Sequence, residues 1–157
     1  MKNKILIICI FSVFFQFCGA KKLVFNYEHN CNEIGTMGTK VIKVFTTGRN
    51  AKVAIEHSDM MAVHAFLFKN VVCQGNNNLP ISSFAYNDKK EFFDDFFNSG
   101  KYKDFVAQSN NASIKSEDRR RMENGDVKIG LLVQVQYSAL KNYMASKGIC
   151  KTMGGLD

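Results

Sequence analysis

The N-terminal twenty residues differ in pattern from the rest of the chain. Two lysines precede a nearly unbroken apolar run, residues 5–17, and the small residues Cys18-Gly19-Ala20 follow it. A basic start, a short apolar core and a small-residue end are typical of a cleavable signal peptide. We therefore predict a signal peptide at residues 1–20. The alternative, an uncleaved anchor, is disfavoured because about 13 apolar residues are few for a membrane span.

Hydrophobic patterning in the remaining chain predicts five strands. Residues 126–137 alternate between apolar and polar side chains, which is typical of a strand buried on one side. Residues 39–47 are β-branched and apolar on both faces, which favours a central position in a sheet. Three shorter candidates complete the set: residues 23–27, 71–73 and 102–108.

The longest helical pattern covers residues 51–69. Mostly small side chains recur there at steps of three and four residues, and such a stripe lets a helix lie close to a sheet. The stripe consists of Ala51, Ala54, Ile55, Ser58, Ala62 and Ala65. Asn50 is placed to cap this helix, so residues 39–69 form a predicted strand–turn–helix unit.

Two shorter helices are predicted further along the chain. Asp88 and Glu91 have the spacing of a capping box, and Gly100 is placed to end the helix that follows them. Ser138 is predicted to cap the last helix, and Gly148 is predicted to end it.

The element order β-β-α-β-α-β-β-α predicts the fold class. It favours a single two-layer α+β domain at residues 21–157, with helices packed on a mostly antiparallel sheet. Polar segments at residues 30–38, 74–83 and 109–126 are interpreted as loops, with Asn124-Gly125 as a turn. No second apolar run reaches membrane-spanning length, so no transmembrane segment is expected in the mature chain.

The charge balance argues against one class of partner. The formal net charge is +7, and loss of Lys2 and Lys4 with the leader would reduce it to +5. The basic run at residues 119–121 is flanked by three acidic residues, so it is locally close to balance. Nucleic-acid-binding proteins more often concentrate basic residues among stacking aromatics. We expect no nucleic-acid partner.

The cysteines indicate the redox environment. The mature chain would keep Cys31, Cys73 and Cys150, which allow three pairings in an oxidising compartment. We favour a disulfide between Cys31 and Cys73, because each lies near the end of a predicted element beside polar loop residues. Cys18 is an alternative site of lipid attachment, as in a bacterial lipoprotein. Phe17 is large where that signal requires a small residue.

Candidate catalytic and metal-binding residues are few. Cys31 and His29 would point the same way on a strand, but a structural cysteine beside an exposed histidine is the favoured interpretation. His57, Met61 and His64 have a helical spacing that can hold a soft metal, but a polar, half-exposed face is favoured. No carboxylate pair is placed for acid–base chemistry. We therefore expect no catalytic residue, no metal and no cofactor.

An aromatic cluster is the strongest candidate for binding. It consists of Phe92, Phe93, Phe96 and Phe97, at helical spacing. Such a cluster most often belongs to a core, although it can also form a pocket wall or an exposed docking patch. Asn111-Ala112-Ser113 is a glycosylation sequon, which matters only in a eukaryotic protein.

Several motifs between residues 35 and 145 occur together. They include Gly35-Thr36-Met37-Gly38-Thr39-Lys40, Ala62-Val63-His64-Ala65, Phe92-Phe93-Asp94-Asp95-Phe96-Phe97 and Gly100-Lys101-Tyr102. Together they resemble a group of small exported envelope proteins of Bacteroides-type Gram-negative bacteria. The strand and alanine-spaced helix are also similar to small periplasmic modules of flagellum-assembly proteins and outer-membrane lipoproteins. The resemblance implies a periplasmic or extracellular location and an unglycosylated Asn111, and it supplies no catalytic residues.

These observations favour an exported, non-enzymatic module that binds a protein partner or a component of the cell envelope. The alternative is a secreted carrier of a small ligand or lipid, with the four phenylalanines as its pocket wall. A secreted cysteine hydrolase, which would need a free thiol at Cys31, is the least favoured hypothesis. The sequence makes no prediction of oligomeric state.

Overall fold

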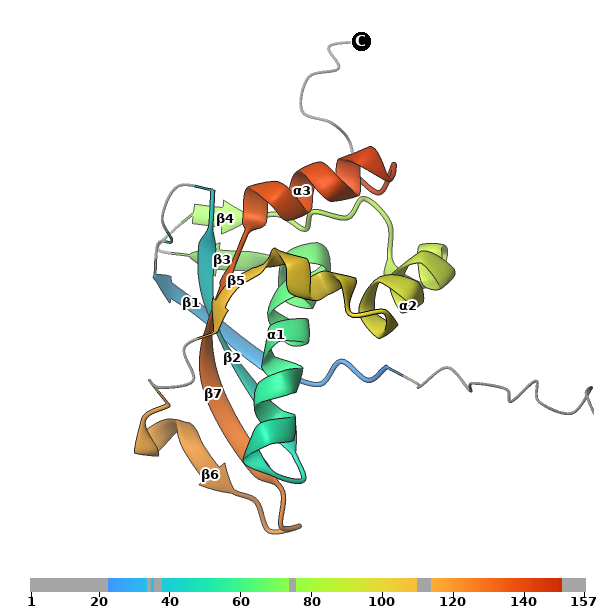
Figure 1. Ribbon diagram of the computed structural model, residues 1–157. Coiled ribbons are helices and arrows are strands. Elements are labelled where there is room, and N and C mark those ends of the chain that lie inside the picture. Colours follow the sequence, from blue (N-terminus) through green and yellow to red (C-terminus); the bar gives the residue numbers. More distant parts are fainter. Residues whose placement is uncertain (1–22, 34, 36–37, 74–75, 110–113, 151–157) are drawn as a thin grey trace, which may run out of the picture.

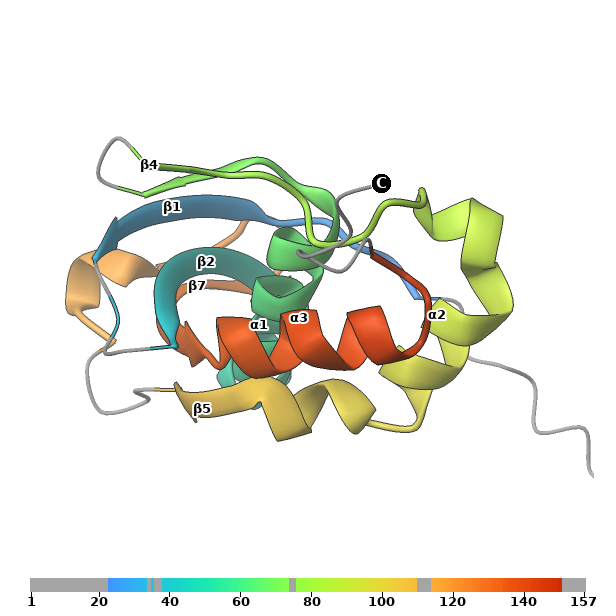
Figure 2. The ribbon, with the colours of Figure 1, turned by 90° about the horizontal axis from the view of Figure 1, so that it is seen from above.

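The computed structural model places three α-helices on one side of a curved sheet (Figures 1 and 2). The predicted signal peptide, Cys18 and the sequon at Asn111 lie outside the described residues. Those described residues are 23–33, 35, 38–73, 76–109 and 114–150. The helices are α1 (Ala51–Phe68), α2 (Lys90–Asn98) and α3 (Tyr137–Ser146). No helix in this part of the chain is long and apolar enough to cross a membrane.

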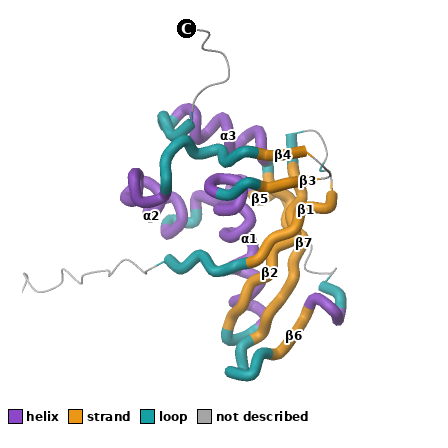
Figure 3. Tube along the Cα trace, turned by 180° about the vertical axis from the view of Figure 1, so that it is seen from behind, coloured by secondary structure: helices purple, strands orange, loops and turns teal. Residues whose placement is uncertain are grey.

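The sheet has seven strands in the order β4-β3-β1-β2-β7-β5, and β6 pairs with the other end of β7. The strands are β1 (Glu28–Glu33), β2 (Lys40–Gly48), β3 (Val71–Cys73), β4 (Asn76–Asn78), β5 (Val106–Ser109), β6 (Arg119–Arg121) and β7 (Val127–Val135). Every pair is antiparallel except β1 with β3. The predicted two-layer α+β domain with a mostly antiparallel sheet is therefore confirmed, and helices and strands separate cleanly in Figure 3.

The β2–α1 unit forms as predicted. The Asn50 side chain accepts a hydrogen bond from Val53 N at 3.0 Å, which caps α1. A Cβ at Gly48 would lie 2.6 Å from Ala54 N, so only glycine allows this close turn. Near the end of β2, Thr46 Oγ1 donates to Ala54 O at 2.6 Å and lies 2.8 Å from Ser58 Oγ. The small-residue stripe thus brings buried polar groups of helix and strand within hydrogen-bonding distance.

The core lies between the inner faces of β2 and β7 and the helices. The inner-face residues are Ile42, Val44, Ile129, Leu131, Val133 and Val135. In α1 every residue from Met61 to Leu67 is buried. The prediction of a half-exposed face at His57, Met61 and His64 is therefore wrong for Met61 and His64, because other elements enclose this end of the helix.

The first predicted strand is displaced. Residues 23–27 are extended but lie outside the sheet, and β1 begins at Glu28 and runs into the predicted loop at 30–38. Leu23, Phe25 and Tyr27 nevertheless pack against the core. Alternation reports which side chains face the interior, and it does not report whether the backbone is paired.

The predicted strand at 102–108 is mostly a 3₁₀-helix. Residues Lys101–Phe105 are 3₁₀-helical, and β5 begins only at Val106. Tyr102 and Phe105 are both buried. Residues three apart share a face in a 3₁₀-helix, so burying both rings favours this turn over a strand.

Two predicted caps are wrong, and two predicted helix ends are right. Asp88 accepts from Ala85 N at 3.0 Å within a preceding 3₁₀-helix, so it does not cap α2. Ser138 lies inside α3, whose N-cap is Gln136. Gly100 and Gly148 have φ of 80° and 68°, and they end α2 and α3 as predicted.

Two further strands lie in segments predicted as loops. β4 consists of three asparagines and pairs with β3, and β6 consists of three arginines and pairs with β7. Neither sequence carries the apolar pattern of a strand. The predicted turn at Asn124-Gly125 joins β6 to β7, with Gly125 at φ 86°.

The predicted disulfide between Cys31 and Cys73 is confirmed. It joins β1 to β3, with a Cα–Cα distance of 4.7 Å. Cys31 therefore carries no thiol, which removes the nucleophile of the hydrolase hypothesis. Cys150 is the free cysteine of the described chain.

Candidate functional site

The predicted phenylalanine cluster lies mainly in the core. Phe93, Phe96 and Phe97 are buried, and Phe92 is half-buried. Phe93 packs edge-on against Phe68, with ring centroids 4.7 Å apart. None of the four phenylalanines lines either of the two surface clefts described below.

The predicted metal candidates are engaged with separate groups. His57 Nδ1 lies 3.3 Å from Thr47 O, whereas His64 Nδ1 lies 2.8 Å from the hydroxyl of Tyr27. Met61 is buried. Among the described residues no group of three or more His, Cys, Asp or Glu side chains is arranged to hold a metal ion.

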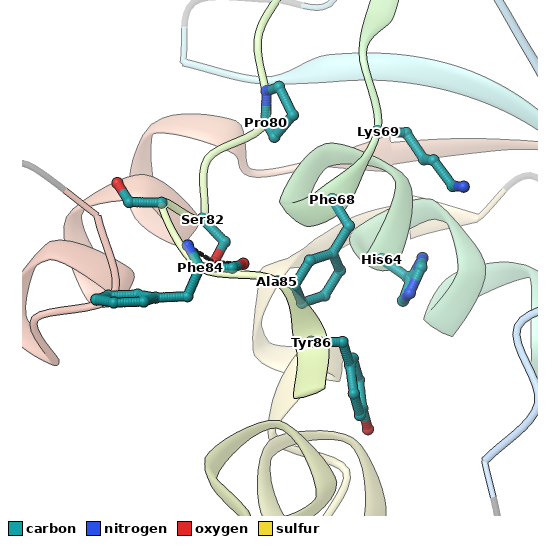
Figure 4. Close-up of a pocket in the computed structure, with 9 residues that line it drawn as sticks. His64, Phe68, Lys69, Pro80, Ser82, Phe84, Ala85 and Tyr86 are labelled. Atoms are coloured by element: carbon teal, nitrogen blue, oxygen red, sulfur yellow. Dashed lines mark hydrogen bonds between the residues drawn. The ribbon is translucent and has the colours of Figure 1, made fainter. Parts of the chain in front are cut away.

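A cleft opens where α1 ends, and we call it the aromatic cleft (Figure 4). Its volume is about 420 Å³. The lining residues are His64, Phe68, Lys69, Pro80, Ser82, Ser83, Phe84, Ala85 and Tyr86. His64, Phe68 and Lys69 come from the end of α1, and the others come from the segment that leads to α2. The lining contains three aromatic rings besides His64, one cation and no carboxylate.

His64 forms the floor of the cleft in an aromatic stack. The Phe25 ring lies nearly parallel to it, with centroids 3.9 Å apart, and the ring of Phe68, one turn further along α1, lies 4.8 Å away. Burial and, to a smaller extent, the charge of Lys69 together lower the pKa of His64 to about 3. The imidazole is therefore neutral at physiological pH and is a poor proton donor to a ligand.

Tyr86 forms the second aromatic wall and is fixed at its hydroxyl. Its Oη donates to Asp94 Oδ1 at 2.8 Å, and Lys90 pairs with the same carboxylate. Burial and then the bond to Asp94 raise the pKa of Tyr86, while Lys90 and then Tyr86 lower the pKa of Asp94. The Tyr86 ring also stacks on Phe93 at 5.4 Å, so the wall is continuous with the core.

The remaining side of the cleft is the loop at residues 79–85, which we call the 79–85 loop. Ile81 N and Ser82 N donate to the last-turn carbonyls Phe66 O and Leu67 O, at 3.0 and 3.1 Å. These bonds satisfy carbonyls that have no partner within the helix. The 79–85 loop is therefore held by the end of α1.

Large apolar side chains of the 79–85 loop project into solvent. Leu79 is 68% exposed and Phe84 is 36% exposed. Ser82 Oγ donates to Phe84 O at 2.8 Å and accepts from Phe84 N, which fixes a tight turn. In Figure 4 the Phe84 ring points away from the rings of Phe68, His64 and Tyr86. Lys89 Nζ lies 5.0 Å from the centroid of the Phe84 ring.

A second cleft lies on the other side of the 79–85 loop. Its volume is about 360 Å³, and Pro80 and Ser83 line both clefts. Its other lining residues are Asn78, Leu79, Ile81, Tyr137, Lys141 and Cys150. Burial raises the pKa of the Cys150 thiol, which keeps it protonated and weakly nucleophilic.

The arrangement offers apolar binding surface and positive charge, and its polar groups are not paired for proton transfer. His64 is neutral, and the Ser82 hydroxyl is engaged in the loop backbone. Sequence reasoning missed this site because its residues come from a helix end and a loop that it treated as polar surface. The apolar residues Leu79, Phe84 and Tyr86 were the available signal. Comparisons with protein-family models, curated proteins and solved structures found no match.

Proposed function

We propose that this chain is an exported, non-enzymatic module that binds a protein partner of the cell envelope through the 79–85 loop. The observation that supports it is the exposure of Leu79 and Phe84 on one loop between two clefts. Anchor side chains with adjacent pockets supply most of the binding energy in many interfaces. The backbone bonds that hold the loop reduce the cost of ordering it on binding.

Export is supported by two independent features. One is the leader pattern at residues 1–20, and the other is the disulfide between Cys31 and Cys73, because disulfides persist mainly in oxidising compartments. Intact-mass analysis of the protein recovered from a periplasmic fraction tests this. We expect the mass of residues 21–157 with two hydrogens missing. Recovery of the chain from the cytosol with Met1 attached would contradict export.

The partner site is tested by photo-crosslinking in the native envelope. A photo-reactive amino acid replaces Leu79, and we expect one discrete adduct. The adduct should disappear when Phe84→Asp is added, and it should persist when Met122→Asp is added. Met122 is a matched control because it is 38% exposed and directly follows β6 in the chain. Figure 1 shows β6 at the opposite end of the sheet from β4, which precedes the 79–85 loop. An adduct that survives Phe84→Asp, or no adduct at all, would refute docking at the 79–85 loop.

The carrier alternative loses its predicted pocket wall. Three of the four phenylalanines are core residues, and the fourth is half-buried. A carrier role would have to use the aromatic cleft instead.

A further inference from the structure

The aromatic cleft presents rings suited to a flat apolar group. Phe68 and Tyr86 are half-buried, with ring centroids 5.6 Å apart, and His64 lies 4.8 Å from Phe68. Aromatic rings favour offset or edge contacts with another ring at about 4.5–7 Å. A cleft of about 420 Å³ is within the usual size range of small-molecule sites.

The positive charge at the cleft determines which sign of charge a ligand should carry. Lys69 is exposed at the end of α1, and no salt bridge engages it within the described chain. The lining contains no carboxylate, and Asp94, which accepts a hydrogen bond from the lining residue Tyr86, is paired with Lys90. An aromatic lining alone would also suit a quaternary ammonium group, but Lys69 would repel it. An anion is therefore favoured.

The C-terminal end of α1 does not cancel the preference of the cleft for an anion. Carbonyls of the last helical turn carry partial negative charge and would repel an anion. Here Ala65 O, Phe66 O and Leu67 O each accept a hydrogen bond, from Lys69 N, Ile81 N and Ser82 N respectively. The Lys69 side chain, which lies above His64 in Figure 4, then supplies the positive charge at the mouth of the cleft.

We propose that the aromatic cleft binds an aromatic carboxylate, with its ring against Phe68 and Tyr86 and its carboxylate paired to Lys69 Nζ. The same chemistry has two possible sources: a free aromatic acid, or the C-terminal aromatic residue of a polypeptide. The site does not depend on docking at the exposed tip of the 79–85 loop.

The test measures four probes against the purified chain by calorimetry. The probes are 2-naphthoate, 2-naphthamide, and a tripeptide ending in phenylalanine as its free acid and as its amide. We expect at least one acid to bind about tenfold tighter than its amide, because an ion pair supplements the ring contact. The acid that binds tighter identifies the source. The chain has no tryptophan, so naphthoate emission gives a second readout.

Lysine variants test whether Lys69 supplies the positive charge that pairs with the carboxylate of the ligand. In Lys69→Gln the acid-over-amide preference should fall below about twofold, and in Lys69→Arg it should persist. Lys52→Gln is the matched control, because Lys52 is exposed on the same helix at its other end. Leu79→Asp should leave naphthoate binding unchanged, which separates this proposal from the partner site. Equal binding of acid and amide, an equal effect of Lys52→Gln, or no binding of any probe would overturn it.

Discussion

The two halves of α1 are held by different interactions. In residues 51–60 only Ala54 and Ser58 are buried, whereas residues 61–67 are buried on every side. The first half contacts the sheet through its small-residue stripe and the hydroxyl pair Thr46–Ser58. The second half is surrounded by the extended segment at 23–27, by α2 and by the 79–85 loop, with Phe25 on His64 and Phe93 on Phe68.

This difference explains where the candidate site lies. A helix that packs on one layer needs one apolar face, and a helix that is enclosed needs apolar residues all around. The second half of α1 is enclosed as far as Leu67, and at Phe68 and Lys69 the enclosure ends. The side chains there are partly in the core and partly in solvent. The aromatic cleft is thus the point at which the surrounding elements stop covering the helix.

The largest expected difference between the two halves of α1 is in the stability lost when an apolar side chain is removed. Phe66 is 1% exposed and packs edge-on against Tyr137 at 5.6 Å. Phe66→Ala should lower the free energy of unfolding by about 4 kcal/mol, since it removes a buried ring and leaves a cavity. Ile55→Ala, in the half-exposed first half, should cost about 1–2 kcal/mol. Urea unfolding followed by circular dichroism measures both, and equal costs would contradict the division of α1 into two halves.

The disulfide should have the next largest effect. It closes a loop that contains all of α1, with a sequence separation of 42 residues. Replacing Cys31 and Cys73 with alanine should cost about 3–4 kcal/mol, because the unfolded chain regains loop entropy. Cys150→Ala is the control and should change stability by less than about 1 kcal/mol. A double variant as stable as the parent would show that packing around α1 alone fixes β3.

His64 makes the enclosed half sensitive to acid. Its pKa is lowered to about 3 in the folded state, against about 6.5 when unfolded. As the pH falls below 6.5, His64 binds a proton in the unfolded chain but stays neutral in the folded chain. Stability is therefore lost progressively down to about pH 3. Between pH 6.5 and 4.5 we expect this group to remove about 2–3 kcal/mol.

The check compares urea midpoints of the parent and His64→Asn over that pH range. Asparagine retains a hydrogen-bonding group near the position of Nδ1 but does not titrate. The slope of the unfolding free energy against pH should therefore be smaller in the variant than in the parent, by the contribution of about one proton. Other titrating groups are common to both proteins. Parallel pH profiles would mean that His64 protonates in the folded state without cost.

Sequence reasoning found the elements whose pattern reflects burial. The β2–α1 unit, β3, β7 and the glycines that end α2 and α3 all lie where the pattern placed them. Burial also explains two errors. An unpaired segment can alternate its apolar residues as a strand does, whereas Tyr102 and Phe105, three residues apart, share a face only in a helical turn.

The missed features depend on long-range contacts. β4 and β6 contain only asparagine or arginine and exist because β3 and β7 offer edges to pair with. The aromatic cleft joins residues from the end of α1 to residues around position 84. The bonds from Ile81 N and Ser82 N to α1 join backbone groups, so the side-chain pattern of the sequence does not predict them.

The smallest expected effect is at the beginning of α1. No acidic residue lies in its first turn, so the Asn50 side chain is the group that satisfies Val53 N and complements the helix dipole there. Asn50→Ala should cost about 1 kcal/mol, and Asn50→Asp, which keeps the acceptor oxygen, should cost less than half of that. Chemical unfolding measures both, and amide exchange at Val53 locates the change. If aspartate were as costly as alanine, the capping bond would not be what holds this half of the helix, and the hydroxyl pair Thr46–Ser58 would have to carry that role.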